Sequence, residues 1–302
     1  MQDPEQLIVE HSQVDLRSPV LVAAFRGWND AGDAATFAAQ HLGKVWSAKR
    51  IASIDPEEFF DFQAVRPQVR LVDGVTREIV WPANELWSAQ IVGSTHDVLL
   101  LVGTEPNTKW KSFSNLMVHL AKKHNVRMLI TFGALLADVP HSRPVPITGT
   151  AVDADLVERL GLQRSQYEGP TGIVGVLQST FSEAGLDSAS LWAAVPHYLA
   201  VNPNPKAALA LVERATALIG VQADIGELSK AASNYEEQVS ELVAADEDVQ
   251  AYVRLLEQRA DERATEDIDP SQLPSGDALA AELENFLRQR DDGPGPPDNT
   301  HN

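Results

Sequence analysis

The sequence predicts an α/β protein that carries a helical extension at its C-terminal end. Over the first 220 residues, short apolar runs alternate with amphipathic segments, which is the pattern of buried strands joined by helices. The clearest run, Asp97–Gly103, is almost continuously apolar and should form a central parallel strand covered on both faces. From Leu228 onward the apolar residues recur at alternating steps of four and three, which is typical of packed helices.

The segments before this central strand follow the same alternation until a hairpin interrupts it. We expect, in order, a short edge strand at Leu7–Val9, a strand at Val20–Phe25, a helix at about Ala31–Leu42, and a strand at Arg50–Ile54 that ends at Asp55 and Pro56. Asp73-Gly74 then separates two runs rich in β-branched residues, within the segment Val69–Trp81. An Asp-Gly pair in this setting is the strongest short-range hairpin signal, so we predict a β-hairpin insertion.

The segments after the central strand return to the α/β pattern. Apolar residues between Phe113 and Ala121 line one face of a helix. The further elements that we expect are a strand at Val126–Gly133, an irregular stretch at Ala137–Pro146 that contains three prolines, a helix after Gly169–Gly172, a last strand at Ser190–Pro196 and a helix at Lys206–Ile219. This unit, residues 1–220, is the predicted α/β domain.

Residues 221–290 form the predicted acidic α-helical extension. The seam of apolar residues is interrupted at Asp246, which is either the N-cap in the turn of a helical hairpin or a polar layer within one long coiled-coil helix. We favour the hairpin. A further short amphipathic helix is expected at Ser275–Arg290, and residues 291–302 are expected to be a disordered tail.

Composition and charge limit the classes of function. The chain of 302 residues carries 43 acidic and 24 basic residues, a net charge of −19, and residues 221–302 hold 20 of the acidic and 6 of the basic ones. Because phosphate backbones and anionic lipids require clustered cations, we expect no nucleic-acid or membrane partner. The polar start at Met1–Gln6 lacks a signal pattern, so we expect a cytoplasmic protein.

Metal and cofactor sites are not expected. The chain contains no cysteine, and His119 and His124 are five residues apart, so they do not share a helix face as a metal-binding pair would. The glycine spacing after the second predicted strand also differs from that of a P-loop or a dinucleotide-binding turn. We therefore predict no metal and no cofactor.

Two turns that lead into predicted helices offer polar groups for a ligand. The first contributes Arg26, Trp28, Asn29 and Asp30, although Asp30 and Asp33 are also suited to capping the next helix. The second, Gly169 to Gly175, is a possible anion cradle, since its helix N-terminus has no nearby acid except Glu168. A glycine inside the helix, Gly175, points instead to close packing. The ligand-binding candidates are Arg26, Trp28, Asn29, Asp30, Asn107, Gly169, Thr171 and Gly172.

The proline-rich loop after the strand at Val126–Gly133 holds a second set of polar residues. There Asp138 could orient His141 beside Arg143, or all of them could hydrogen-bond backbone groups that the prolines leave unpaired. With Glu105, these residues are the only catalytic candidates, and none of them is assigned a firm role. The sequence contains no G-x-S-x-G motif that would support a hydrolase triad.

Four segments together resemble the bacterial branch of the proteasome assembly chaperone 2 family: Gly27–Gly32, Gly103–Asn107, Asp138–Pro144 and Gly169–Ile173. The resemblance spans Val14 to Gly220 and continues into an acidic helical extension. It implies a three-layer αβα sandwich related to purine nucleoside phosphorylases. It also implies a homo-oligomer, for example a trimer, with archaeal and eukaryotic relatives that help to assemble proteasome α-rings. It supplies no established activity for bacterial members.

Two functions are consistent with these observations. The favoured one is a non-catalytic, oligomeric scaffold that binds proteasome subunits or another protein; the alternative is a nucleoside phosphorylase- or hydrolase-like enzyme. A phosphorylase needs convergent cations, and the predicted edge offers chiefly Arg26 and Arg143 among several acidic residues. Hydrolysis with Asp138 or Glu105 as general base tolerates acid better. The family's proteasome-docking tail, a hydrophobic residue followed by Tyr and any residue, does not match Asp298–Asn302, so a different surface would make such a contact.

Overall fold

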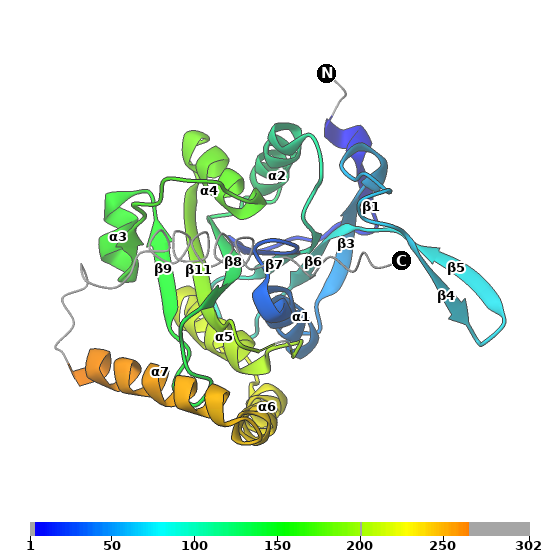
Figure 1. Cartoon of the computed structure of the whole chain (residues 1–302). Helices are drawn as coiled ribbons and strands as arrows, with labels where there is room; N and C mark the ends of the chain where they lie inside the picture. The colour runs from blue at the N-terminus through cyan, green and yellow to red at the C-terminus, as the bar shows by residue number, and fades with distance from the viewer. Residues whose placement is uncertain (1–3, 200, 266–302) are drawn as a thin grey trace, which may run out of the picture.

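The chain folds around a nine-stranded mixed β-sheet, with helices on both of its faces (Figure 1). This computed structural model describes residues 4–199 and 201–265. The strands of the sheet lie in the order β1-β3-β6-β7-β2-β8-β11-β9-β10. Their bounds are β1 (Ile8–Glu10), β2 (Val20–Arg26), β3 (Lys49–Ile54), β6 (Asn84–Ala89), β7 (Val98–Thr104), β8 (Met128–Ala137), β9 (Ile147–Ala151), β10 (Gln163–Arg164) and β11 (Asp187–Pro196). The predicted α/β class is confirmed.

Four parallel strands, β7-β2-β8-β11, form the interior of the sheet. Six of the seven residues of β2 are buried, as a strand covered on both faces requires. The strand that was predicted to be central, β7, is also interior, but it is parallel to β2 only and antiparallel to β6. The predicted last strand, β11, is not at the edge, because β9 pairs antiparallel along its outer side.

Two helix layers enclose this sheet. On one face lie α1 (Ala34–Val45) and α5 (Pro205–Ile219), whose apolar residues pack with alternate strand residues such as Val22 and Leu100. On the other face lie α2 (Trp110–Lys123) and α4 (Ile173–Glu183), which pack on the intervening residues, such as Leu21 and Leu101. A short helix, α3 (Ala154–Leu160), follows β9. Single 3₁₀ turns occupy Pro4–Leu7, Ala31–Asp33 and Pro56–Glu58. The three-layer αβα arrangement is thus present.

The predicted hairpin is a separate two-stranded sheet that projects from the body, drawn in cyan in Figure 1. It consists of β4 (Gln68–Val72) and β5 (Thr76–Val80), joined through Asp73 and Gly74 with φ of 54° and 73°. Positive φ at both central residues is the geometry that favours an Asp-Gly turn. We call residues 68–80 the arm.

The C-terminal helices form a helical hairpin, as favoured from the sequence. Helix α6 (Gly226–Ala244) and helix α7 (Glu247–Thr265) meet at Asp246, whose Oδ1 accepts hydrogen bonds from the N–H groups of Asp248 and Val249 at 3.0 and 3.2 Å. The alternating steps of four and three from Leu228 place Leu242 on the apolar seam, but Leu242 is 60% exposed and Val243 is buried instead. The predicted helix at 275–290 and the tail at 291–302 lie outside the described residues.

The segment between α5 and α6 is tied to α1. His41 Nε2 lies 2.8 Å from the carbonyl oxygen of Asp224, and Trp46 Nε1 donates a hydrogen bond to the carbonyl of Gln222 at 2.9 Å. Leu228, at the start of α6, belongs to the same apolar core as α1 and α5. The division into domains 1–220 and 221–290 stays a prediction. Within residues 4–199 and 201–265, none of the helices has the length and apolar character needed to cross a lipid bilayer.

Candidate functional site

Most of the predicted site residues follow the carboxyl ends of the four parallel strands, whereas Gly169, Thr171 and Gly172 lie between β10 and α4, and the residues separate into two groups. Asn29 follows β2 and Glu105 follows β7, and these two are in contact. Asp138 and His141 follow β8, next to the residues that follow β11. We describe the first group as the Glu105 cluster and the second as the His141 cluster.

The Glu105 cluster joins three elements through one carboxylate oxygen. Glu105 Oε1 accepts hydrogen bonds from Asn29 Nδ2 at 3.0 Å and from the backbone N–H of Ile173, the first residue of α4, at 2.8 Å. A carboxylate at a helix N-terminus is stabilised by the helix dipole. The anion cradle predicted at Gly169–Gly175 therefore holds an acid of its own chain. The expectation that only Glu168 lies near it is wrong, because Glu105 comes from a distant strand.

Close approach explains two of the glycines around this cluster. A Cβ atom on Gly172 would lie 2.2 Å from Asn29 Nδ2, and one on Gly175 would lie 2.1 Å from the hydroxyl of Thr171. Packing is therefore sufficient to account for Gly175. Asn29 is 1% exposed, and its Oδ1 has no hydrogen-bond partner among the described residues.

The other predicted ligand residues have local roles or face solvent. Asp30 caps α1, since Oδ1 accepts from Ala35 N at 2.7 Å and Oδ2 from the Thr36 hydroxyl at 2.5 Å; burial raises its pKa. This is the capping role considered from the sequence. Asn107 Oδ1 accepts from the N–H of Asp61 at 3.1 Å. The remaining candidates are placed as follows: Trp28 is 60% exposed, Gly169 adjoins the Tyr167 ring, and Arg26 is exposed at the end of β2.

Both ring nitrogens of His141 are hydrogen-bonded. Its Nδ1 lies 2.9 Å from the Tyr198 hydroxyl, which also accepts from the His141 backbone N–H, and its Nε2 lies 3.1 Å from the Ser240 hydroxyl on α6. Burial lowers the pKa of His141, and the charge of Lys206 lowers it further, whereas burial raises the pKa of Tyr198 to about 12. The Tyr198 hydroxyl thus donates to Nδ1, and a neutral His141 donates from Nε2 to Ser240.

Arg143 is held by α7. Its Nε and Nη2 donate to the two carboxylate oxygens of Asp261 at 2.7 and 2.8 Å, and Nη1 lies 3.5 Å from Glu257. Paired donors of this kind fit a carboxylate closely. The predicted catalytic arginine is therefore occupied by the acidic extension.

Asp138 does not orient His141, contrary to one interpretation of the sequence. Its Oδ1 lies 3.0 Å from His197 Nδ1 and accepts from the Tyr252 hydroxyl of α7 at 3.1 Å. His197 and Tyr198 were not among the residues predicted from the sequence. Their position directly after the apolar run of β11, at the carboxyl end of a parallel strand, was the signal that could have revealed them.

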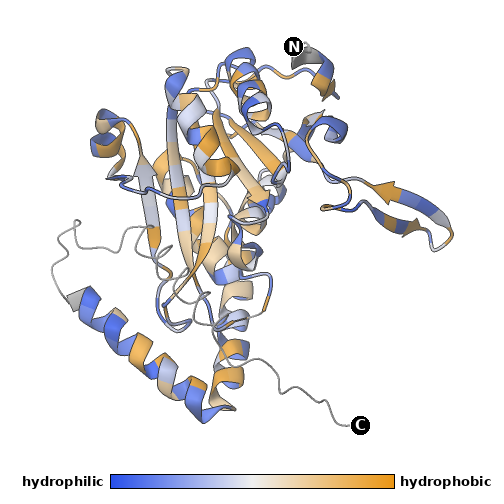
Figure 2. Cartoon of the chain, turned by 45° about the horizontal axis from the view of Figure 1, so that its top comes forward, coloured by the Kyte–Doolittle hydropathy of each residue, from blue (hydrophilic) through white to orange (hydrophobic). Residues whose placement is uncertain are grey.

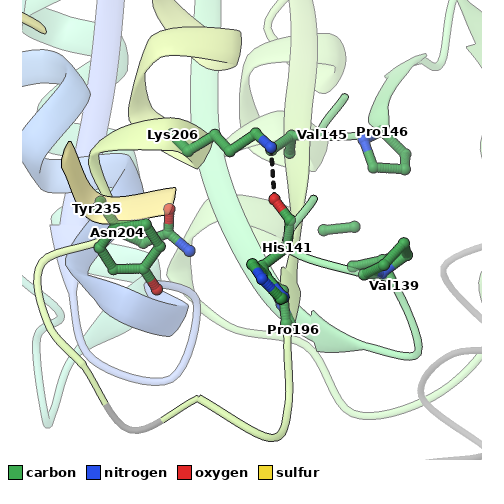
Figure 3. Close-up of a pocket in the computed structure, with 10 residues that line it drawn as sticks. Val139, His141, Val145, Pro146, Pro196, Asn204, Lys206 and Tyr235 are labelled. Atoms are coloured by element: carbon green, nitrogen blue, oxygen red, sulfur yellow. Dashed lines mark hydrogen bonds between the residues drawn. The ribbon is translucent and has the colours of Figure 1, made fainter. Parts of the chain in front are cut away.

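The cavity beside His141 is small. It has a volume of about 10 Å³, and Figure 3 shows Tyr235, Asn204 and Lys206 around it, with Lys206 Nζ donating to the carbonyl of His141. The Tyr235 hydroxyl is buried and has no hydrogen-bond partner among the described residues. A cavity of this size has room for about one water molecule, which could satisfy that hydroxyl.

A much larger depression lies between α1 and the base of the arm, on the sheet face of β6 and β7. Its volume is about 850 Å³. We call it the side groove, and its apolar lining includes Val80, Trp81, Trp87, Leu100 and Val102. Of the predicted ligand residues, Arg26 alone lines it.

Acidic and histidine side chains do not gather into a candidate metal site anywhere in residues 4–199 and 201–265. Of the four residues Asn29, Glu105, His141 and Arg143, whose convergence on one pocket would favour an enzyme, His141 alone lines the small cavity. The His141 cluster is therefore part of a packed interface with α6–α7, and the Glu105 cluster is part of one with the start of α4.

Comparison with known proteins gives a consistent result. The profile of the PAC2 family matches residues 24–243. A PAC2 family protein from Streptomyces avermitilis is 45% identical, with a TM-score of 0.72, over 78% of this chain and 99% of that one. A proteasome-assembly chaperone homologue from Mycobacterium tuberculosis is 46% identical, with a TM-score of 0.71 and the same coverage. PbaB of Pyrococcus furiosus, an archaeal proteasome activator, is 19% identical over 78% of this chain and 97% of its own, with a TM-score of 0.64, and shares the fold. None of the curated proteins matches this sequence.

Proposed function

Because this chain belongs to the PAC2 family, we propose that it is a non-catalytic, oligomeric scaffold of the proteasome-assembly-chaperone kind, which binds proteasome subunits in the cytoplasm. The observation that carries this proposal is the occupation of the candidate catalytic residues. Asp138, His141 and Arg143 each contact a side chain of α6 or α7. They hold the extension in place and leave no free acid, base and cation facing a common cavity.

The nucleoside-processing alternative meets two physical obstacles at the same edge. The cavity beside His141, at about 10 Å³, is far smaller than the roughly 300 Å³ or more of a small-molecule pocket. A phosphate ion at the N-terminus of α4 would have to displace the carboxylate of Glu105 from Ile173 N. Both obstacles favour a role in binding protein.

The name of the Mycobacterium tuberculosis relative supports the choice of partner. At 46% identity over 99% of that chain, the two proteins share the α/β unit that would contact a proteasome subunit. We therefore choose the α-subunit as the partner, since it is the component that family chaperones assemble into rings.

The proposal is tested with purified α-subunits from the organism that encodes this chain. Light scattering after size exclusion should detect a complex at about 10 μM of each protein, which requires a Kd in the micromolar range. Proteasome β-subunits serve as the control and should elute separately. The rate of α-ring formation, followed by native mass spectrometry, should rise several-fold in the presence of this chain. If α- and β-subunits both elute apart from it and ring formation is unchanged, the proposal is refuted.

A further inference from the structure

The arm exposes apolar side chains that no other described part of the chain covers. By strand alternation, Val69, Leu71 and Ile79 lie on one of its faces, and they are 61%, 57% and 55% exposed. Figure 2 shows the arm extending from the sheet with apolar residues along its strands. A two-stranded hairpin by itself is marginally stable in water, and exposed apolar patches of this kind mark interaction sites. The arm therefore has the features of a segment that is covered in an assembly.

The side groove offers a matching apolar surface, but the arm of the same chain cannot enter it. Gln68 and Val80, at the base of the arm, themselves line the groove. The turn at Asp73 lies five residues further along the strands, about 16 Å away at the rise of a β-strand, and Figure 1 shows it directed away from the body. An arm that fills this groove must come from another molecule.

Charge favours a second copy of this chain as the source of that arm. Two copies with a net charge of −19 repel each other unless the contact lies where charge is balanced. The arm is such a region, because its acidic residues, Asp73 and Glu78, equal its basic residues, Arg70 and Arg77, in number.

The groove supplies the complementary charge. Arg26 and Arg66 line it, and neither forms an ion pair with another residue in the described ranges. The carboxylate of Asp73 at the tip of the arm likewise has no ion-pair partner there. Insertion of the arm thus brings an unpaired acid toward unpaired cations while its apolar face covers the apolar lining of the groove.

We propose that the arm of one molecule docks in the side groove of a second copy, and that this head-to-tail contact builds the homo-oligomer. The inference rests on the oligomeric part of the proposed function and names the surfaces that produce it. Each copy offers one arm and one groove, so the contact is heterologous and closes into a ring when the rotation between subunits allows it.

The test uses the full-length chain and measures mass by sedimentation and light scattering. We expect the wild-type chain to have a mass that is a multiple of 32.9 kDa. Leu71→Glu with Ile79→Glu removes the apolar face of the arm, and Gln40→Trp adds bulk at an exposed position that lines the groove. Each variant should have the mass of one chain. Thr76→Glu, on the opposite face of the arm, is the control and should retain the wild-type mass.

Mixing the two single-chain variants separates a heterologous contact from contact between arms. The arm variant keeps an intact groove and the groove variant keeps an intact arm, so an equimolar mixture should form pairs and no larger species. A mixture that stays monomeric, or an arm variant that keeps the wild-type mass, overturns the proposal. Circular dichroism spectra and unfolding midpoints should be unchanged in both variants, because the substituted side chains are exposed.

Failure of this inference can be told apart from failure of the proposed function. If the arm variant remains oligomeric but binds α-subunits, the arm–groove contact is refuted and the partner stands. If the wild-type chain is monomeric, both the contact and the oligomeric part of the proposed function are refuted. A third outcome is that the wild-type chain is monomeric and that mutation of the arm abolishes its complex with α-subunits. This result assigns the arm to the α-subunit and also overturns docking on a second copy.

Discussion

Replacement of Glu105 by alanine should lower the free energy of unfolding by about 2–4 kcal/mol. One oxygen of this partly buried carboxylate accepts hydrogen bonds from Asn29 Nδ2 and Ile173 N, at 3.0 and 2.8 Å. A hydrogen bond to a charged group contributes about 1.5–3 kcal/mol, and a carboxylate at a helix N-terminus adds about 0.3–1 kcal/mol. The expected loss of stability is smaller than the sum of these contributions, because water can enter part of the space left by the side chain and hydrogen-bond to the two donors.

Glu105→Gln separates the hydrogen bonds from the charge. The amide oxygen of the glutamine can still accept hydrogen bonds from both donors, so the free energy of unfolding should fall by only about 1 kcal/mol. Glu241→Ala removes an exposed carboxylate of α6 and should change the stability by less than about 0.5 kcal/mol. Urea unfolding followed by tryptophan fluorescence measures all three. The role of the carboxylate in joining these elements is refuted if the alanine variant unfolds at the same urea concentration as the wild type. It is also refuted if the glutamine variant loses as much free energy of unfolding as the alanine variant.

Three further predictions follow from the site. Gly172→Ala should destabilise the chain by about 2 kcal/mol, since its Cβ would overlap the amide of Asn29, whereas Gly226→Ala, at the start of α6, should be nearly neutral in the same unfolding assay. Burial and the charge of Lys206 keep the pKa of His141 below its ordinary 6.5, so the unfolded chain binds a proton there before the folded one does. The contribution of His141 to stability is fully present above pH 6.5 and is lost as the pH falls through the lower folded pKa. The hydrogen-exchange protection factors of the α6 amides should therefore fall as the pH is lowered below 6.5, and His141→Gln should remove that dependence. A panel of purine nucleosides, incubated with and without phosphate, should release no free base by chromatography; phosphate-dependent release would instead favour the phosphorylase alternative.

The elements that could be predicted from the sequence are those with a strong local signal. The arm was identified by Asp73-Gly74, because only a few residue types accept positive φ at both central positions of a tight turn. The break between α6 and α7 was identified at Asp246, whose short side chain caps the following helix. In both places the structure depends on neighbours within a few residues, so the sequence pattern was sufficient.

Three strands of the main sheet, β6, β9 and the two-residue β10, were missed, and the residues of β6 and β9 do not resemble those of buried strands. Strand β6 contains Asn84, Glu85 and Ser88, and its antiparallel neighbours β3 and β7 provide the pairing that defines it. Strand β9 includes Gly149, where a Cβ atom would lie 2.6 Å from Leu162. The glycine is explained by Leu162, which lies between α3 and β10, and no periodicity in the strand itself indicates that contact.

The candidate residues Asn29, Glu105 and His141 follow the ends of strands, as the sequence indicated, but their partners depend on tertiary structure. His141 contacts Tyr198 and Ser240, which are 57 and 99 residues away in the sequence. Glu105 reaches Ile173 over 68 residues. Patterns within the sequence can assign a residue to the end of a strand, but the order of strands and the crossing of α4 decide which side chains meet.

The position of the acidic extension connects the charge of the chain with its proposed role. The sequence shows an excess of acid in residues 221–302, and the structure places part of it over the cations of the sheet edge. Glu236 pairs with Lys206 at 2.5 Å, and Asp261 binds Arg143 through both carboxylate oxygens. An enzyme that bound phosphate at this edge would need those cations free, and releasing them would mean breaking the contacts that hold α6 and α7 on the sheet. The extension therefore covers the edge at which open α/β sheets bind small ligands. In place of that edge it presents an acidic surface, which is suited to a protein partner.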